Sequence, residues 1–162
     1  SKMIIKGDIW AQYDRGMITH EEAMHGCMEA YPDVKEAVKC FFEGVNAVHV
    51  PWPDVHNKLP LLKAGGYKIY LLSNYPDEMF HAHTKDAGFM EYTDGGVISY
   101  QVHFNKPERE IYECILSKYG LKPEECLFFD DTAENINAAA ACGIPGVVIT
   151  SEQKILEEIE KL

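Results

Sequence analysis

The sequence is short of positive charge, since its 162 residues carry 15 lysines and arginines against 26 aspartates and glutamates. The formal net charge of −11 argues against a nucleic-acid backbone or an anionic membrane surface as the main partner. An anionic substrate would therefore need a local cation at its binding site.

Long apolar runs and paired cysteines are also missing. No run approaches the roughly 20 residues needed to span a bilayer, and the first residues lack the pattern of a signal peptide. The five cysteines form no Cys-x-x-Cys pair, and their odd number argues against a disulfide framework. These absences predict a soluble cytoplasmic protein with free thiols.

Two regions differ in their pattern of secondary structure. Residues 1–50 have a helical pattern throughout, with a capping box that begins at Thr19. Pro51 and a second proline two residues later then interrupt the chain. Residues 51–162 alternate between helices and strands, which predicts a mostly parallel sheet covered on both sides. We therefore expect a helical cap subdomain over 1–50 and an α/β core over 51–162.

Glycines and prolines mark the boundaries of the expected elements. The expected strands cover 68–72, 96–100, 126–129 and 146–150. The expected helices cover 33–42, 54–64, 77–87, a segment opened by Pro107, 133–142 and the charged C-terminal residues.

Two adjacent acids follow the apolar run at 126–129, which predicts a strand buried on both faces. Asp130 and Asp131 thereby occupy a strand-to-helix turn, and ligands of parallel sheets bind beyond the carboxyl ends of the strands. A hard cation, Mg²⁺ above all, is the natural partner of carboxylates there. The alternative is that Asp131 or Thr132 caps the next helix, with Glu134 as the reciprocal side chain if Asp131 is the cap.

Two further polar sites occupy equivalent places in the alternation. Ser73 and Asn74 follow the strand at 68–72, and Lys106 precedes the helix opened by a proline. We expect these residues and the acid pair to gather at one rim of the sheet. A hydroxyl, an ammonium and a metal on Asp130 can together hold the oxygens of a phosphoryl group. Taken singly, each is as typical of a turn or of a solvated surface.

Three short motifs carry these residues, namely Leu71-Leu72-Ser73-Asn74, Asn105-Lys106-Pro107-x-x-x-Ile111-Tyr112 and Phe128-Phe129-Asp130-Asp131-x-x-x-Asn135. They resemble motifs II, III and IV of the haloacid dehalogenase (HAD) superfamily. Residues 7–23 are similar to the helical cap of the branch that includes sugar-phosphate phosphatases and the N-terminal domain of epoxide hydrolase. The resemblance implies a Rossmann-like core, a phosphoryl group bound by Ser73 and Lys106, Mg²⁺ on Asp130, and Asp131 as support for the metal or its waters.

The resemblance also implies a first motif, an apolar strand that ends in Asp-x-Asp and supplies a nucleophilic aspartate. The only early candidate is Asp8, which is followed by Ile9 and Trp10 with no second aspartate, and which is more typical of a surface or capping residue. We therefore expect this chain to be a fragment without the nucleophile. Its sheet would lack a central strand between those ending at Ser73 and Asp130, a gap of about 10 Å.

Residues and resemblance together predict a Mg²⁺-dependent phosphomonoester hydrolase that acts on a small phosphorylated metabolite through an aspartyl-phosphate. Ser73 and Lys106 are the expected catalytic residues, and Asn74 is a further substrate-binding residue. This chain alone is expected to be inactive. One alternative is a metal-independent 2-haloacid dehalogenase, for which an acid pair without a cation is an odd choice. Another is a non-catalytic scaffold that binds phosphate or Mg²⁺, and a receiver domain would carry its acid pair first and its lysine last.

Overall fold

The computed structural model describes residues 4–5, 7–47 and 52–162, which form two compact units. The first unit comprises Ser1–Val50, Ser73–Ala87 and Ile98–Asn105, and the second comprises Pro51–Leu72, Gly88–Val97 and Lys106–Leu162. The units therefore interleave along the chain. Pro51, where the sequence predicts a boundary, lies outside the described residues, and the division at residue 50 stays a prediction.

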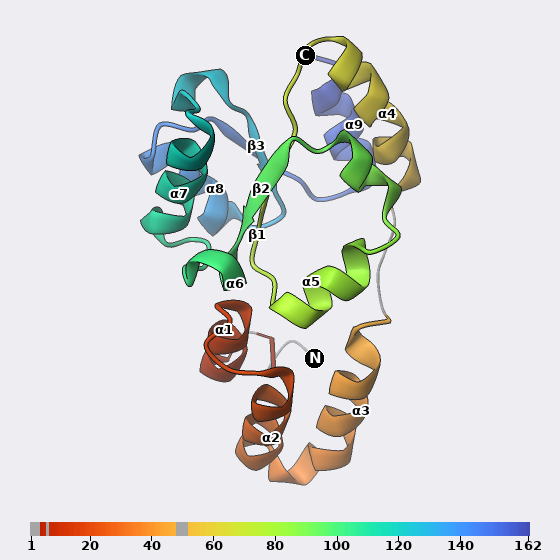
Figure 1. The fold of residues 1–162 in the computed structure, drawn as a ribbon, viewed down its shortest axis with the longest axis vertical. Coiled ribbons are helices and arrows are strands. Elements are labelled where there is room, and N and C mark those ends of the chain that lie inside the picture. The colour runs from red at the N-terminus through yellow and green to blue at the C-terminus, as the bar shows by residue number, and fades with distance from the viewer. Residues whose placement is uncertain (1–3, 6, 48–51) are drawn as a thin grey trace. The chain divides into compact units, whose positions relative to one another are not determined.

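Helices make up the first unit, apart from one end residue of each of two strands. They are α1 (Asp8–Asp14), α2 (His20–Ala30), the 3-10 helix η1 (Pro32–Val34), α3 (Lys35–Val45), α5 (Asp77–Thr84) and the short α6 (Ser99–Val102). The first three α-helices are drawn in red and orange in Figure 1.

The predicted capping box at the start of α2 is confirmed. Thr19 Oγ1 accepts a hydrogen bond from Glu22 N at 3.2 Å, and Glu22 Oε2 accepts one from Thr19 N at 2.8 Å. The predicted helix over 33–42 differs at both ends, because a 3-10 turn precedes it and it continues through Gly44 to Val45. A Cβ at Gly44 would meet no atom within 4 Å, so this glycine is not placed there by close packing.

Aromatic side chains dominate the core of the first unit. Phe42 of α3 is 1% exposed, and its ring centroid lies 5.8 Å from that of Trp10 and 5.3 Å from that of His20. The buried residues of this core are Trp10, Tyr13, Ala23, Cys27, Val38, Phe42 and Met79. Because most of them come from α1, α2 and α3, these three helices share one apolar interior.

The second unit holds the strands and their covering helices. Its elements are α4 (Pro53–Ala64), β1 (Tyr70–Ser73), the 3-10 helix η2 (Gly88–Tyr92), β2 (Gly95–Ile98), α7 (Arg109–Tyr119), the 3-10 helix η3 (Pro123–Glu125), β3 (Phe128–Asp130), α8 (Ala133–Ala141), β4 (Gly146–Val148) and α9 (Glu152–Ile159), with the last residues of β1 and β2 counted in the first unit. Each of the four predicted strands is present, with ends that differ from the prediction by at most two residues.

Among the described residues the strands form two separate two-stranded sheets, β1 with β2 and β3 with β4 (Figure 1). The second pair is parallel, as predicted, with Phe128 opposite Gly146 and Asp130 opposite Val148. Ile149 N donates to Asp130 O at 2.8 Å, which extends this ladder by one bond. The predicted absence of a central strand stays a prediction.

Two expectations about these elements are wrong. The predicted helix start at Pro107 is two residues early, because Glu108 is extended, with φ −62° and ψ 136°, and α7 begins at Arg109. The run at 126–129 is not buried on both faces, since Leu127 is 39% exposed and Phe128 and Phe129 are only half-buried. A strand with one described neighbour cannot be covered as a central strand is.

Helix α9 caps the start of α4. Trp52, the N-cap residue of α4, makes no side-chain capping bond. Instead, Glu152 Oε1 accepts hydrogen bonds from Asp54 N at 2.9 Å and Val55 N at 3.3 Å. A carboxylate at a helix N-terminus satisfies amides that lack partners within the helix and opposes the positive end of the helix dipole.

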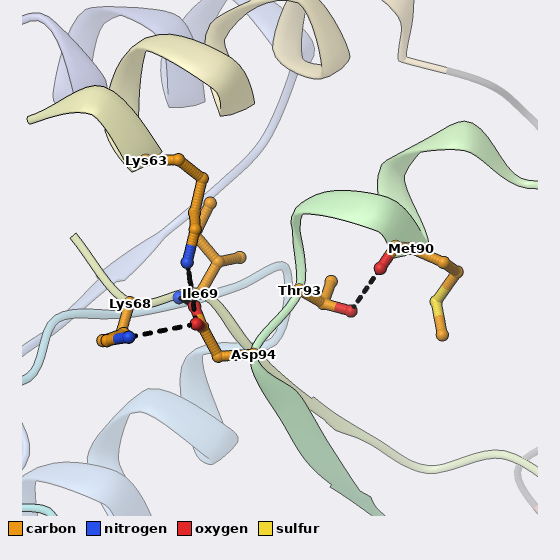
Figure 2. A network of polar contacts seen from close by, with 6 residues as sticks. All are labelled: Lys63, Lys68, Ile69, Met90, Thr93 and Asp94. Atoms are coloured by element: carbon orange, nitrogen blue, oxygen red, sulfur yellow. Dashed lines mark hydrogen bonds and ion pairs between the residues drawn. The ribbon is translucent and has the colours of Figure 1, made fainter. Parts of the chain in front are cut away.

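Asp94 joins three elements of the second unit, as Figure 2 shows. Its Oδ2 accepts hydrogen bonds from Lys63 Nζ at 2.6 Å and from Ile69 N at 2.8 Å, and its Oδ1 also accepts from Lys68 Nζ at 3.4 Å. The bond from Lys63, followed by that from the Ile69 backbone, lowers the pKa of the Asp94 carboxyl to about 2. The carboxylate thus ties the end of α4 to the chain entering β1 and β2.

We expect Asp94→Asn to flatten the dependence of stability on pH in the acid range. A carboxyl whose pKa is about 2 in the folded state and about 3.9 when unfolded contributes stability that is complete above about pH 4. That contribution is lost as the pH falls through the folded pKa. Urea midpoints measured from pH 6 to pH 2 test this. Asp86→Asn, at an exposed aspartate, is the control for loss of one charge, and equal curves for wild type and Asp94→Asn would contradict the prediction.

Candidate functional site

A buried ion pair joins two of the predicted site residues in the second unit. Lys106 Nζ lies 2.5 Å from Asp130 Oδ2, and the two side chains are 10% and 3% exposed. The ammonium also lies 5.5 Å from the centroid of the Phe128 ring. Charges buried to this degree are stable only when paired and hydrogen-bonded, so each of these groups holds the other in place.

The second oxygen of Asp130 holds the start of α8. Asp130 Oδ1 accepts hydrogen bonds from Thr132 N at 2.8 Å and from Asn135 Nδ2 at 2.9 Å. Thr132 occupies the N-cap position, as one alternative from the sequence had it, but its side chain makes no capping bond and donates to Asp131 Oδ1 at 3.2 Å. Asp130, to which the sequence argument gave no part in starting this helix, therefore holds the amide of the N-cap residue and the side chain of Asn135.

Tyr112 supports this arrangement from α7. Its hydroxyl donates to Asn135 O at 2.9 Å, and its fully buried ring stands edge-on to Phe128 at 6.0 Å between centroids. Burial raises the pKa of the Tyr112 hydroxyl, and the negative charge of Asp130 raises it further, so the hydroxyl stays a donor. Sequence reasoning quoted Tyr112 and Asn135 in motifs without a role. Their positions, five residues past Pro107 and four residues past Asp131, were the available signal.

The two carboxylates of the acid pair differ in their surroundings. Asp130 is buried with both oxygens bound to N–H groups, whereas Asp131 is exposed and accepts a hydrogen bond from the Thr132 hydroxyl. Asp130 thus holds neighbouring groups inside the unit, and Asp131 faces solvent at the start of α8.

Ser73 and Asn74 follow the pattern expected at a strand end. Ser73 is the last residue of β1 and Asn74 follows it, and both are half-buried. These two residues belong to the first compact unit, whereas Lys106, Asp130 and Asp131 belong to the second. Their gathering into one site with Lys106 stays a prediction.

The acid pair fits a small cation site in its donor chemistry. Within the described ranges, no group of three or more His, Cys, Asp or Glu side chains could hold a metal ion. Mg²⁺ needs fewer protein ligands, since it is usually held by one or two carboxylates, several waters and the phosphate of a substrate. Asp131, with Asp130 beside it, provides that smaller set.

The comparison with known families decides the assignment. A family model described as haloacid dehalogenase-like hydrolase matches residues 8–143. This chain belongs to that family. The predicted superfamily, the α/β fold class and the hydrolase class are therefore confirmed.

Relatives of this haloacid dehalogenase-like chain have more than one named activity. The sesquiterpene phosphatase astK of Aspergillus oryzae is 26% identical over 159 residues, which are 98% of this chain and 81% of that protein. The (S)-2-haloacid dehalogenase 4A of Burkholderia cepacia is 25% identical over 90% of this chain, which spans only 60% of that protein.

A solved relative adds a ligand-bound structure to the comparison. It is a family enzyme of Bacteroides thetaiotaomicron in complex with magnesium and inorganic phosphate, with a TM-score of 0.68 and 27% identity over 89% of this chain and 75% of that one. None of the helices in the described part of the haloacid dehalogenase-like chain has the length and apolarity that crossing a bilayer demands.

Proposed function

We propose that this haloacid dehalogenase-like protein is a Mg²⁺-dependent phosphatase that acts on a small phosphorylated metabolite. The observation that carries the proposal is the buried Lys106–Asp130 pair with the exposed Asp131 beside it. Adjacent carboxylates next to an anionic substrate repel it and each other unless a cation is present. A phosphatase that uses Mg²⁺ gives both acids a purpose, and the phosphatase relative and the magnesium and phosphate complex support that reading.

Each residue has a distinct part in the proposal. Lys106 donates hydrogen bonds to phosphoryl oxygens, and Asp130 orients its ammonium. Because both Asp130 oxygens already accept N–H bonds, Asp131 is the better candidate for the carboxylate that faces the cation. When bound, the metal supplies electrostatic stabilisation of the charge on the phosphoryl oxygens. Ser73 and Asn74 are proposed as further donors to those oxygens.

The reaction proposed is a double displacement at phosphorus. A carboxylate oxygen forms a bond to phosphorus as the ester P–O bond breaks, and the leaving alkoxide takes a proton. Water then hydrolyses the aspartyl-phosphate and releases inorganic phosphate. The printed sequence contains no Asp-x-Asp, and the nucleophile is not assigned to any of its residues.

A panel of phosphate esters tests the proposal on the protein expressed from its whole reading frame. We expect Mg²⁺-dependent release of phosphate from at least one of an aryl phosphate, phosphoglycolate, flavin mononucleotide and a sesquiterpenyl phosphate. Lys106→Met should lower kcat/KM by about 100-fold or more, as loss of a group that stabilises developing charge does. Lys122→Met, at an exposed lysine, is the control.

The 162-residue chain by itself forms the second arm of this experiment. We expect it to release no phosphate, because it contains no Asp-x-Asp. Equal turnover by the chain and by the protein from the whole reading frame would contradict the missing-nucleophile part of the proposal.

A 2-haloacid dehalogenase is the second candidate, and the similarity to the Burkholderia cepacia enzyme supports it. That chemistry releases halide and needs no metal. Release of chloride from 2-chloropropionate in the presence of a chelator, without phosphate release from any ester, would favour it over the phosphatase.

A further inference from the structure

The C-terminal end of α1 is bound by side chains from the segment 99–105, and both lie in the first unit. Ser99 Oγ donates to Asp14 O at 2.5 Å, and Asn105 Nδ2 donates to Ala11 O at 2.9 Å. The last carbonyls of a helix lack N–H donors within the helix, so the Ser99 hydroxyl is well matched to Asp14 O. Ala11 O also accepts from Arg15 N at 3.2 Å, and the Asn105 amide is a second donor to it. Ser99 is fully buried and Asn105 is 7% exposed, so both bonds are shielded from water.

A third side chain completes this attachment. His103, whose backbone is left-handed at φ 62°, donates through Nδ1 to Arg15 O at 2.7 Å. The two segments also approach closely, because a Cβ at Gly16 would lie 3.1 Å from Tyr100 O. We call Ser99, His103 and Asn105 the α1 clamp. Its three bonds fix the seven residues of 99–105 relative to α1.

Lys106 follows the clamp directly but is held by a different element. The boundary between the two compact units falls at the peptide bond between Asn105 and Lys106. Asn105 is bound to Ala11 of α1, while Lys106 is bound to Asp130 at the end of β3. Successive Cα atoms are about 3.8 Å apart and joined by a rigid peptide, so a displacement of Asn105 is passed to the Lys106 backbone.

We infer that Asn105 is a positioning residue that couples α1 to the ammonium of Lys106. The inference rests on the proposed function for its catalytic consequence, because there Lys106 binds the phosphoryl group. Movement or loosening of α1 shifts the start of the Lys106 side chain, whose other end is fixed on Asp130. A misplacement of about 1 Å in a catalytic group can cost about 100-fold in rate, so a residue that touches no substrate can control turnover from this position.

The first test follows Lys106 itself and needs no turnover. The side-chain ¹H–¹⁵N resonances of lysine are recorded for the wild-type chain, Asn105→Ala and the near-isosteric Asn105→Asp, which loses the donor. We expect the Lys106 resonance to shift or broaden in both variants while that of Lys63 stays in place. Thr84→Val is the matched control, because it removes a different side-chain bond to a carbonyl in the same unit, from Thr84 Oγ1 to Phe80 O. An unchanged Lys106 resonance in both Asn105 variants, or an equal shift in the control, overturns the inference.

The second test measures turnover with the protein from the whole reading frame. Asn105→Ala is expected to lower kcat by about 10-fold to 100-fold with little change in KM, and to add nothing in a Lys106→Met background. Additive losses in the double variant overturn the inference. If Lys106→Met alone leaves turnover intact, the proposed function fails, and the resonance experiment still decides the coupling.

Discussion

Asp130→Asn is expected to lower the free energy of unfolding by about 3–5 kcal/mol, because it removes the carboxylate that is paired with the buried ammonium of Lys106. Lys106→Met should cost less. In that variant Asp130 still accepts hydrogen bonds from Thr132 N and Asn135 Nδ2, whereas Asp130→Asn removes the carboxylate that contacts the Lys106 ammonium. We therefore expect Asp130→Asn to lower the free energy of unfolding more than Lys106→Met does.

Urea unfolding of both single variants and the double variant measures this asymmetry. The double variant Lys106→Met with Asp130→Asn buries no charge at the pair and should recover part of the loss seen in Asp130→Asn. Lys122→Met breaks the exposed pair between Lys122 and Glu125, which are 2.7 Å apart, and should leave the unfolding curve unchanged. Equal losses in the two single variants with no recovery in the double variant would contradict the argument.

Phe42→Ala is expected to cost about 3–5 kcal/mol, the range for removing a fully buried aromatic side chain. The cavity would open between α1 and α3, because the Phe42 ring packs against those of Trp10 and Phe41 as well as that of His20. Trp10 provides a fluorescence signal next to the site. Val34→Ala, at a half-exposed valine of η1, is the control and should change stability little. A loss below about 1 kcal/mol for Phe42→Ala would show that the first unit collapses around the cavity.

Elements whose signals are local were the ones that the sequence predicted well. Thr19 and Glu22 are three residues apart and satisfy each other, so the start of α2 follows from the pattern alone. The start of α7 does not, because a proline is compatible with either a turn or a helix start, and the conformation of Glu108 decides between them. Leu127 was predicted to be covered because it lies in an apolar run. Its exposure depends instead on which strands lie beside β3, and the composition of the run does not give that.

The site shows the same division. Position at an element boundary predicted that Lys106 and Asp130 carry function, but their contact joins residues 24 apart in sequence and no periodicity encodes it. The different surroundings of the two acids could not be predicted from the sequence either. Asp130 and Asp131 are chemically identical, and only the path of the chain buries one against Lys106 and leaves the other exposed.

The capping of α4 by Glu152 has a consequence for how the second unit opens. The amides of Asp54 and Val55 lie in the first turn of α4, where no carbonyl of the same helix can reach them, so their protection from exchange depends on α9 remaining docked. The fraying of a helix at one end of a unit is usually local and independent of the other helices. We therefore expect the first turn of α4 to open together with the first turn of α9, which carries Glu152.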